Sequence, residues 1–312
     1  MNNEYKAKNP VVIIVYNRPN ITKKVFNVVR LAKPKELFVI ADGPKESSED
    51  IERCKKTREI FDNISWSCDL YKNYSDYNMG GPERIPSGLN WVFKNVQQAI
   101  ILEHDCVPAI SFFRFCDDLL DYYKIDNRIG MISGNNFQKY QVNNYSYYFS
   151  IFTHCWGWAT WKRAWDFFDI NISQWKELKY RNFLNYYFCK TTYNNFWYQI
   201  FERQFKNIKR HWDFAWTFNC WSQNMLTILP NKNLITNIGF GSKATNTKDK
   251  NSPFANMKSY ELNFPLRHPP YCYPDYQADM YTQKYNFGPR SFLSKMITLK
   301  KSILSHHSEI AI

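Results

Sequence analysis

The feature that most limits the possible folds is a repeated order of short buried strands and helices in the first hundred residues. Residues 11–15 form an uninterrupted β-branched run, Val-Val-Ile-Ile-Val, which is typical of a strand buried on both faces of a parallel sheet. Residues 37–41 and 99–102 repeat this pattern. Helices are expected over 21–32, 48–61 and 86–96. This alternation predicts an α/β fold with an open, mostly parallel sheet.

Polar clusters follow each of the three predicted strands. They are Tyr16-Asn17-Arg18, Asp42-Gly43 and Glu103-His104-Asp105. Because parallel strands share one carboxyl edge, where α/β proteins place their sites, we expect these clusters to converge. The carboxylates at positions 103 and 105 can hold a hard divalent ion, Mn²⁺ or Mg²⁺, through oxygen. A solvated strand end is the plainer interpretation of an isolated acidic pair.

The residue composition and the periodicity of the chain change after about residue 134. A helix after Pro108 and a strand over 129–134 continue the earlier pattern, and residues 155–165 then hold four tryptophans. Asn-rich stretches at 182–195 and 246–251 are expected to form loops. No repeat or low-complexity linker divides the chain, so both halves are expected to share one body.

The net charge and the cysteines limit which partners and which cellular location we expect. The chain is 44% hydrophobic and 18% aromatic, which indicates a globular protein. Its formal net charge of +13 favours anionic partners: nucleic acid, a membrane surface or a phosphate-bearing substrate. The eight cysteines include no Cys-x-x-Cys pair, which argues against structural zinc. With neither a signal peptide nor a membrane-spanning stretch in view, we expect reduced thiols and a cytoplasmic location.

These pieces together resemble the GT-A class of nucleotide-sugar glycosyltransferases, which have a Rossmann-like fold. The resemblance is nearest to bacterial cytosolic enzymes related to the N-glycan β-1,2-N-acetylglucosaminyltransferases. The matching segments, in order, are VVIIVYNRP, VIADGP, NMGGPERIPSGLNWVF, IILEHDCVP, HCWGWATWKRAW, HWDFAW and LITNIGFGSKATN. Each segment alone is weak, whereas the ordered set is specific.

The resemblance implies a site for the nucleotide of the donor. The position of Arg18 helps to shape the nucleotide pocket in the family, and that of Asp42 accepts a hydrogen bond from the uracil ring. Turn residues are the alternative for both, since Asn-Arg-Pro and Asp-Gly-Pro also suit turns. Tyr16, Asn17 and Gly43 belong to the same expected site. Arg84 could reach the donor diphosphate, or it could be a solvated cation at a helix start.

The resemblance also implies the roles of the acidic motif. Its last residue, Asp105, would coordinate the metal, with Glu103 beside the donor. His104 stands where the family usually has Asp and would face the ribose; a neutral imidazole can still bind a hydroxyl there. Residues 239–245, ending at Thr245, resemble a loop that orders over the donor phosphates, with a plain surface loop as the alternative. His268 is a possible second metal ligand, although a lone histidine is more often structural.

Two further segments carry the sugar chemistry that the resemblance implies. Trp158 could form part of a wall against which the donor sugar stacks, or the Trp-Gly-Trp segment could be plain aromatic core. Asp213 stands where the family has its catalytic base, and burial among indoles would raise its pKa. A helix-capping role is the alternative for Asp213.

The sequence therefore predicts a metal-dependent, inverting glycosyltransferase that uses a nucleotide diphosphate sugar, UDP-linked, as its donor. The expected acceptor is a glycan or lipid-linked sugar of bacterial surface polysaccharide or lipopolysaccharide synthesis. We expect a donor half over 1–108, an acceptor half over 109–286 and a basic amphipathic tail over 287–312 that could contact anionic membrane. The rivals are a sugar-nucleotide pyrophosphorylase and a basic, aromatic-rich nucleic-acid binder. No nucleic-acid recognition motif is present, so no nucleic-acid partner is expected.

Overall fold

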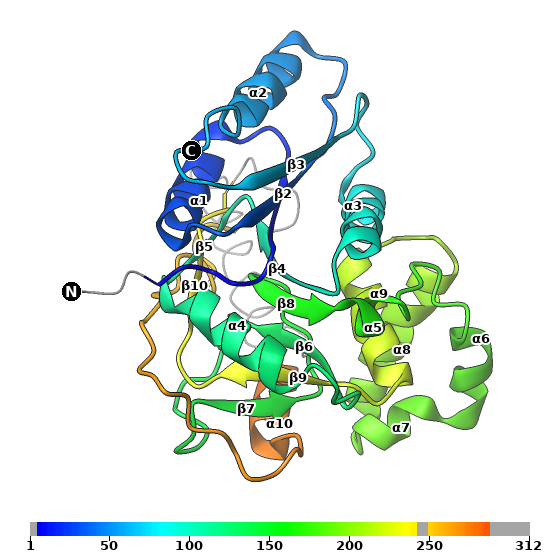
Figure 1. Ribbon diagram of the computed structural model, residues 1–312. Helices are drawn as coiled ribbons and strands as arrows, with labels where there is room; N and C mark the ends of the chain where they lie inside the picture. Colours follow the sequence, from blue (N-terminus) through cyan, green and yellow to red (C-terminus); the bar gives the residue numbers. More distant parts are fainter. Residues whose placement is uncertain (1–4, 242–248, 288–312) are drawn as a thin grey trace, which may run out of the picture.

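The computed structural model describes residues 5–241 and 249–287 (Figure 1). The strands are β1 (Val11–Val15), β2 (Glu36–Ala41), β3 (Asp69–Tyr74), β4 (Gln98–Glu103), β5 (Cys106–Pro108), β6 (Ile129–Ser133), β7 (Tyr147–Ser150), β8 (Trp158–Trp161), β9 (Leu226–Pro230) and β10 (Ile235–Asn237). The α-helices are α1 (Pro19–Ala32), α2 (Ser48–Glu59), α3 (Gly81–Asn95), α4 (Ser111–Tyr122), α5 (Lys162–Trp165), α6 (Trp175–Leu178), α7 (Phe183–Tyr187), α8 (Thr191–Phe205), α9 (Trp212–Ser222) and α10 (Tyr276–Tyr285).

The centre of the protein is an eight-stranded sheet in the order β3-β2-β1-β4-β8-β6-β9-β7. Strands β3, β2, β1 and β4 run parallel, and β6 and β9 are also a parallel pair. Strands β8 and β7 are antiparallel to their neighbours. The order β3-β2-β1-β4 is that of a doubly wound, Rossmann-like sheet. The predicted α/β class, with a mostly parallel sheet flanked by helices, is therefore confirmed.

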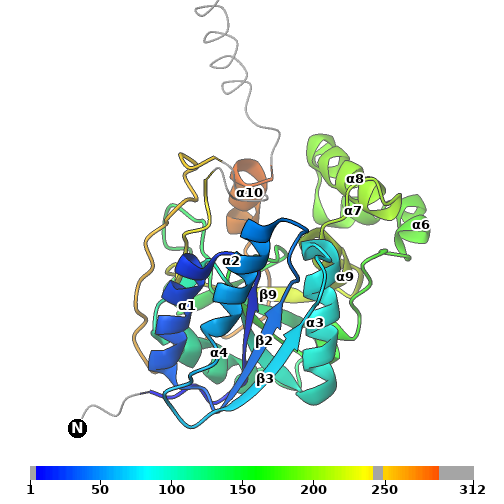
Figure 2. The same cartoon turned by 90° about the horizontal axis from the view of Figure 1, so that it is seen from above.

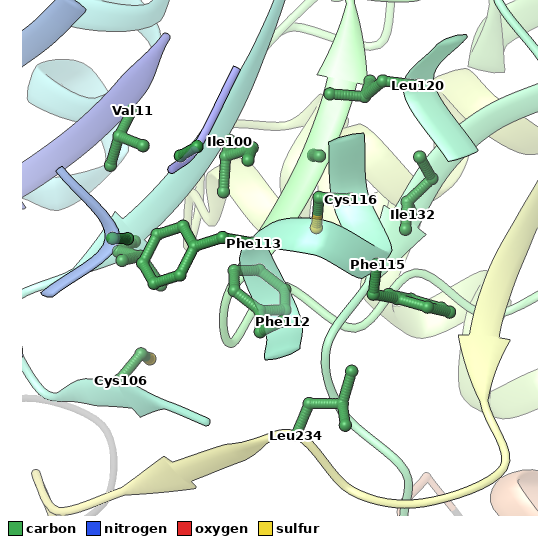
Figure 3. Packing of buried hydrophobic residues seen from close by; sticks show 14 of the residues in the cluster. Val11, Ile100, Cys106, Phe112, Phe113, Phe115, Cys116, Leu120, Ile132 and Leu234 are labelled. Atoms are coloured by element: carbon green, nitrogen blue, oxygen red, sulfur yellow. The ribbon is translucent and has the colours of Figure 1, made fainter. Parts of the chain in front are cut away.

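Helices cover both faces of this sheet (Figures 1 and 2). Helices α1 and α4 bury their apolar sides in the cluster on one face, and α3, α5 and α9 bury theirs in the cluster on the other. Figure 3 shows the first face, where Phe112, Phe113 and Cys116 of α4 lie against Val11 and Ile100 of the sheet. The continuous apolar runs of β1 and β4 follow from this arrangement, because helices exclude water from both sides.

Most predicted elements of the first half are present, with shifted ends. Helix α3 begins at Gly81 rather than at residue 86 and contains Pro86 within its first turns. Strand β3 was not predicted, because it has the polar sequence Asp-Leu-Tyr-Lys-Asn-Tyr in place of an apolar run. It lies at the edge of the sheet and is largely exposed.

The expectation of a loop over 182–195 is wrong. Helix α7 and the beginning of α8 occupy this stretch. Phe188, which directly follows α7, and Trp197 of α8 pack with Trp221 of α9 in a third apolar cluster. Burial of this surface outweighs the weak helix propensity of asparagine.

Several expectations concern residues that the structure does not describe. Thr245 and nearly all of the predicted tail lie outside the described residues. The division into halves at residue 108 stays a prediction; the central sheet continues across it through the pairing of β4 with β8. Among the described residues, none of the helices is long and apolar enough to cross a membrane.

Candidate functional site

The polar clusters that follow β1, β2 and β4 do converge on one edge of the sheet. Ile14 of β1 pairs with Glu103 of β4, and Val15 pairs with Ala41 of β2. Since these strands are parallel neighbours, the residues that follow them leave the sheet side by side. The sequence-based expectation of convergence is confirmed.

Arg18 and Asp105 meet at this edge. Nη1 of Arg18 lies 3.7 Å from Oδ2 of Asp105, and each side chain is 14% exposed. The same Nη1 donates a 3.1 Å hydrogen bond to the carbonyl of Gly239. A guanidinium beside a carboxylate, both with some access to water, can bind an anionic group and a cation next to each other.

The chain after β10 packs directly on Asp105. The N–H of Ile238 donates to the Asp105 carbonyl at 2.9 Å, and a Cβ atom at Gly239 would overlap the Asp105 carboxylate. Only glycine therefore allows this close approach. The segment starting at Gly239, which resembles a donor-phosphate loop, thus begins at the acidic motif, while its end lies outside the described residues.

Glu103 of β4 and Asp213 of α9 are two acidic residues close enough for the charge of Asp213 to act on Glu103. Burial raises the pKa of Glu103 to about 8, helped by the charges of Asp105 and Asp213. Burial also raises the pKa of Asp213, against the influence of His211. The raised pKa expected for Asp213 is thus present, and its neighbour is a carboxylate from another element, which is typical of functional sites.

Asp213 lies in the first turn of α9, where its carboxylate accepts a 3.0 Å bond from the N–H of Phe214. The capping position itself is His211, whose side chain makes no cap bond. Asp213 therefore contributes charge to the helix N-terminus without being its cap. The structure leaves its carboxylate half-buried at the site.

Tyr16 and Asn17 are held by an acidic residue that the sequence patterns did not identify. The Tyr16 hydroxyl donates to Oδ2 of Asp50 at 2.5 Å, and the Asn17 amide donates to Oδ1. Burial opposes ionisation of Asp50, yet these bonds and one from the Lys45 N–H hold its pKa below the usual value. Asp50 lies in the first turn of α2, where an acidic residue is favoured by the helix dipole whatever else it does, so its type and position alone do not indicate this role.

Asp42 has a different environment from the one expected of a uracil ligand. Its carboxylate is buried, and both oxygens accept two hydrogen bonds each. The donors are the N–H groups of Gly43, Met79 and Gly80 and the amide of Asn78, at 2.9 to 3.1 Å. A carboxylate has about four lone-pair sites, so this one is fully used. We therefore correct the Asp42 assignment to the alternative, a turn residue that fixes the loop before α3.

Gly43 belongs to the same turn. A Cβ atom at this position would overlap the backbone of Tyr77. The glycine is required for the packing of the loop, which is a sufficient reason for its presence beside Asp42.

Arg84 is neither a diphosphate ligand nor a solvated cation. Its side chain is 4% exposed. It donates to the carbonyl of Ala41, to the carbonyl and side chain of Asn73, and to Ser87. Arg84 therefore fastens α3 to the ends of β2 and β3, and both sequence interpretations of this residue are wrong.

The Trp-Gly-Trp segment divides between core and site. Trp158 is fully buried in β8 and stacks on Trp212 with ring centroids 5.8 Å apart. A sugar-stacking wall needs an exposed ring face, so Trp158 belongs to the core alternative. Trp156 is half-buried instead, and its ring packs edge-to-face on that of Phe240, the residue after Gly239, with ring centroids 5.7 Å apart. Trp156 is therefore a better candidate than Trp158 for stacking against a sugar ring.

His268 does not join Asp105. Its ring stacks on Tyr122, the last residue of α4, with centroids 4.3 Å apart, and Nδ1 lies 2.9 Å from the Tyr147 hydroxyl. Asp105 precedes the opposite end of α4, a helix about 18 Å long at 1.5 Å per residue. We therefore remove His268 from the candidate metal ligands.

His104 does lie beside Asp105, with Nε2 3.7 Å from Oδ2. Burial lowers the pKa of His104, against the charge of Asp105, so the neutral ring is favoured. A neutral imidazole can exchange a hydrogen bond with a hydroxyl, as expected for its place in the motif.

The residues at this edge fit a hard divalent cation that a substrate helps to bind. Asp105 offers a partly exposed carboxylate, with Glu103 next to it. Among the described residues, no three His, Cys, Asp or Glu side chains gather in a potential metal cluster. Mg²⁺ commonly uses one or two carboxylates together with substrate phosphates and water, and this donor set suits that arrangement.

Comparison with known proteins gives no family assignment. No protein-family model matches the chain, and no curated protein matches it in sequence.

Some solved structures show a partial likeness. A mannosyltransferase from Pyrobaculum calidifontis in complex with GDP-Man and Mn²⁺ is 13% identical over 50% of this chain and 45% of its own, with a TM-score of 0.34. The galactosyltransferase LgtC with donor and acceptor sugar analogues is 10% identical over 68% of this chain and 70% of its own, with a TM-score of 0.36. A cytidylyltransferase from Leptospira borgpetersenii is 11% identical over 51% of this chain and 63% of its own, with a TM-score of 0.32.

The chain thus spans less than two thirds of the mannosyltransferase and of the cytidylyltransferase. Because all three TM-scores lie below 0.5, we transfer no activity or residue role from these proteins.

Proposed function

We propose that this protein is a metal-dependent, inverting glycosyltransferase with a UDP-linked sugar as donor and a glycan or lipid-linked sugar of bacterial surface polysaccharide as acceptor. The observation that carries the proposal is the ion pair of Arg18 with Asp105 at the carboxyl edge of the sheet. Glu103 ends the strand that precedes Asp105, and Asp213 lies near enough for its charge to raise the pKa of Glu103. Arg18 follows β1, Asp105 follows β4 and Asp213 belongs to α9, and these three residues supply the cation, the metal ligand and the base that transfer from a sugar diphosphate requires.

Asp105 would hold the divalent ion, and Arg18 would pair with the donor diphosphate. Arg18 already makes its bonds to other parts of this edge, the Gly239 carbonyl and the Asp105 carboxylate, so its guanidinium is fixed in place before substrate arrives. When bound, the ion would neutralise charge on the leaving nucleotide diphosphate.

Asp213 would act as the general base. Its carboxylate would accept the proton of the acceptor hydroxyl while that oxygen bonds to the anomeric carbon of the donor sugar. The bond from this carbon to the diphosphate breaks at the same time with its electron pair going to the diphosphate, so the configuration inverts. A raised pKa makes Asp213 a stronger base than an exposed aspartate, which supports this role.

A panel of nucleotide sugars tests the proposal. Purified protein is heated with UDP-, GDP- and CMP-linked sugars, with and without Mn²⁺, and unfolding is followed. A donor at about 100 times its Kd should stabilise the folded state by about 2.7 kcal/mol, in the presence of Mn²⁺ only. The absence of stabilisation by every nucleotide sugar would contradict the proposal.

A product assay separates the rival functions. A glycosyltransferase releases UDP from the donor, whereas a pyrophosphorylase forms UTP when pyrophosphate is added. Filter binding with RNA and DNA tests the nucleic-acid alternative with the same preparation. UDP release as the sole activity supports the proposal.

A further inference from the structure

Asn135 lies at the same edge of the sheet and has no role in the site described so far. Strands β4 and β6 flank β8, and Trp158 of β8 pairs with Ile101 on one side and Ser133 on the other. Glu103 lies two residues beyond Ile101, and Asn135 lies two residues beyond Ser133. The two parallel strands thus deliver Glu103 and Asn135 to the same edge, with β8 between them.

The side-chain amide of Asn135 is buried without a hydrogen bond. The residue is 1% exposed, and in the described part of the chain neither Nδ2 nor Oδ1 has a partner. A buried amide that makes no bond loses its hydration without compensation, and native proteins seldom leave one in this state. A bound partner from outside the protein would remove that cost.

The neighbouring asparagine shows the contrast. Asn136 is 5% exposed, and its Nδ2 donates to the carbonyl of Pro230 at 2.8 Å while its Oδ1 accepts from the N–H of Gln138 at 2.7 Å. The two residues have the same chemistry and nearly the same burial. Asn136 therefore serves the fold, whereas the fold makes no use of the amide of Asn135.

A second unpaired donor belongs to the same row of residues. Nε1 of Trp158 is buried and makes no hydrogen bond within the described residues. Trp158 stacks on Trp212, which adjoins Asp213 in the sequence. Unpaired polar atoms thus occur on β8 and after β6, beside the strand that carries Glu103.

We infer that Asn135 binds a hydroxyl group of a saccharide at this edge; the inference rests on the proposed function. A hydroxyl both donates and accepts, which matches an amide that offers a carbonyl and an NH₂ group. The neutral amide suits the uncharged sugar, whereas the cationic Arg18 suits the diphosphate. Asn135 is then a specificity residue and takes no part in proton transfer.

The test compares Asn135→Leu with the matched control Asn136→Leu. Calorimetry with Mn²⁺ measures the Kd of UDP alone and of the intact UDP-sugar that stabilises the wild type most. For Asn135→Leu we expect an unchanged Kd for UDP, a Kd for the intact donor raised about 10-fold, and an unchanged or higher Tm. For Asn136→Leu we expect a lower Tm, because its two bonds are lost, and wild-type affinities.

A second arm distinguishes donor from acceptor sugar. If both Kd values of Asn135→Leu equal those of the wild type, transfer to a panel of methyl glycosides is measured at saturating donor. A KM raised about 10-fold with kcat retained assigns Asn135 to the acceptor sugar.

Wild-type values in both arms would overturn the inference and leave the proposed function standing, and they are the result expected if Asn135 binds only a buried water. If the wild type itself binds no nucleotide sugar, the proposed function fails and the inference fails with it.

Discussion

The carboxylate of Asp42 accepts a 2.9 Å hydrogen bond from the backbone N–H of Gly80, at the start of α3. The same carboxylate accepts from the N–H groups of Gly43 and Met79. These bonds tie the end of β2 to the loop that follows β3, on the rim of the candidate site.

We expect Asp42→Ala to lower the free energy of unfolding by about 2 to 4 kcal/mol, since buried backbone N–H groups lose their acceptor. Urea denaturation measures the change. The control is Asp121→Ala, because Asp121 is an exposed residue whose ion pair with Lys124 should contribute less than about 1 kcal/mol. Wild-type stability combined with a lost affinity for UDP would instead restore Asp42 as a nucleotide ligand.

Arg84 gives a parallel prediction. Arg84→Lys keeps the charge but cannot reach Ala41, Asn73 and Ser87 together, so the free energy of unfolding should fall by about 2 kcal/mol or more. The exposed Arg181→Lys should leave stability nearly unchanged. The folded variant should bind UDP as the wild type does; a large loss of UDP affinity at normal stability would return Arg84 to the donor site.

The sequence predicted which strands carry the site better than it predicted the roles of the side chains there. Buried apolar runs predict β1, β2 and β4, and their parallel order predicts that Arg18 lies near Asp105, as the structure shows. Hydrophobic patterning carries this information because a strand covered on both faces must be apolar throughout.

Side-chain roles depend on contacts between distant parts of the chain, which patterning does not contain. Asp42 and Arg84 have residue types suited to binding a nucleotide, yet loop N–H groups and strand-end carbonyls already use them. His268 and Asp105 both suit a metal, but opposite ends of α4 separate them. The unpaired amide of Asn135 is likewise visible only once its surroundings are known.

Asp213 is the proposed base, and Asp213→Asn tests it. The amide keeps the size of the side chain and cannot accept the acceptor proton, so turnover should fall about 10²-fold or more at an unchanged Kd for the donor. Steady-state UDP release and donor calorimetry measure the two quantities. The exposed Asp166→Asn is the control, and near-normal turnover in Asp213→Asn would assign Asp213 to the fold alone.

The buried carboxyl group of Asp279 in α10 should make the stability of the protein depend on pH. Burial raises its pKa from 3.8 to about 7, although Ser150 and the Ile151 N–H donate to it. A carboxyl group that holds its proton more tightly in the folded state favours folding at low pH, and this contribution is lost as the pH rises from about 4 to 7.

Asp279→Asn removes that titration. The stability of the wild type relative to Asp279→Asn should therefore fall between pH 4 and pH 7, by at most about 1.4 kcal/mol for each unit of pKa shift. Urea denaturation at several pH values gives the difference. A difference that is constant over this range would contradict the account of Asp279.

The most direct test of the account is the binding of a UDP-sugar to Asp105→Ala. Calorimetry with and without Mn²⁺ compares this variant with the wild type and with Asp121→Ala, and circular dichroism checks the fold. We expect Mn²⁺ to strengthen donor binding in the wild type and in Asp121→Ala, and to have no effect in folded Asp105→Ala. Equal Mn²⁺-dependent binding by Asp105→Ala and the wild type would contradict a metal-assisted donor site at this edge of the sheet.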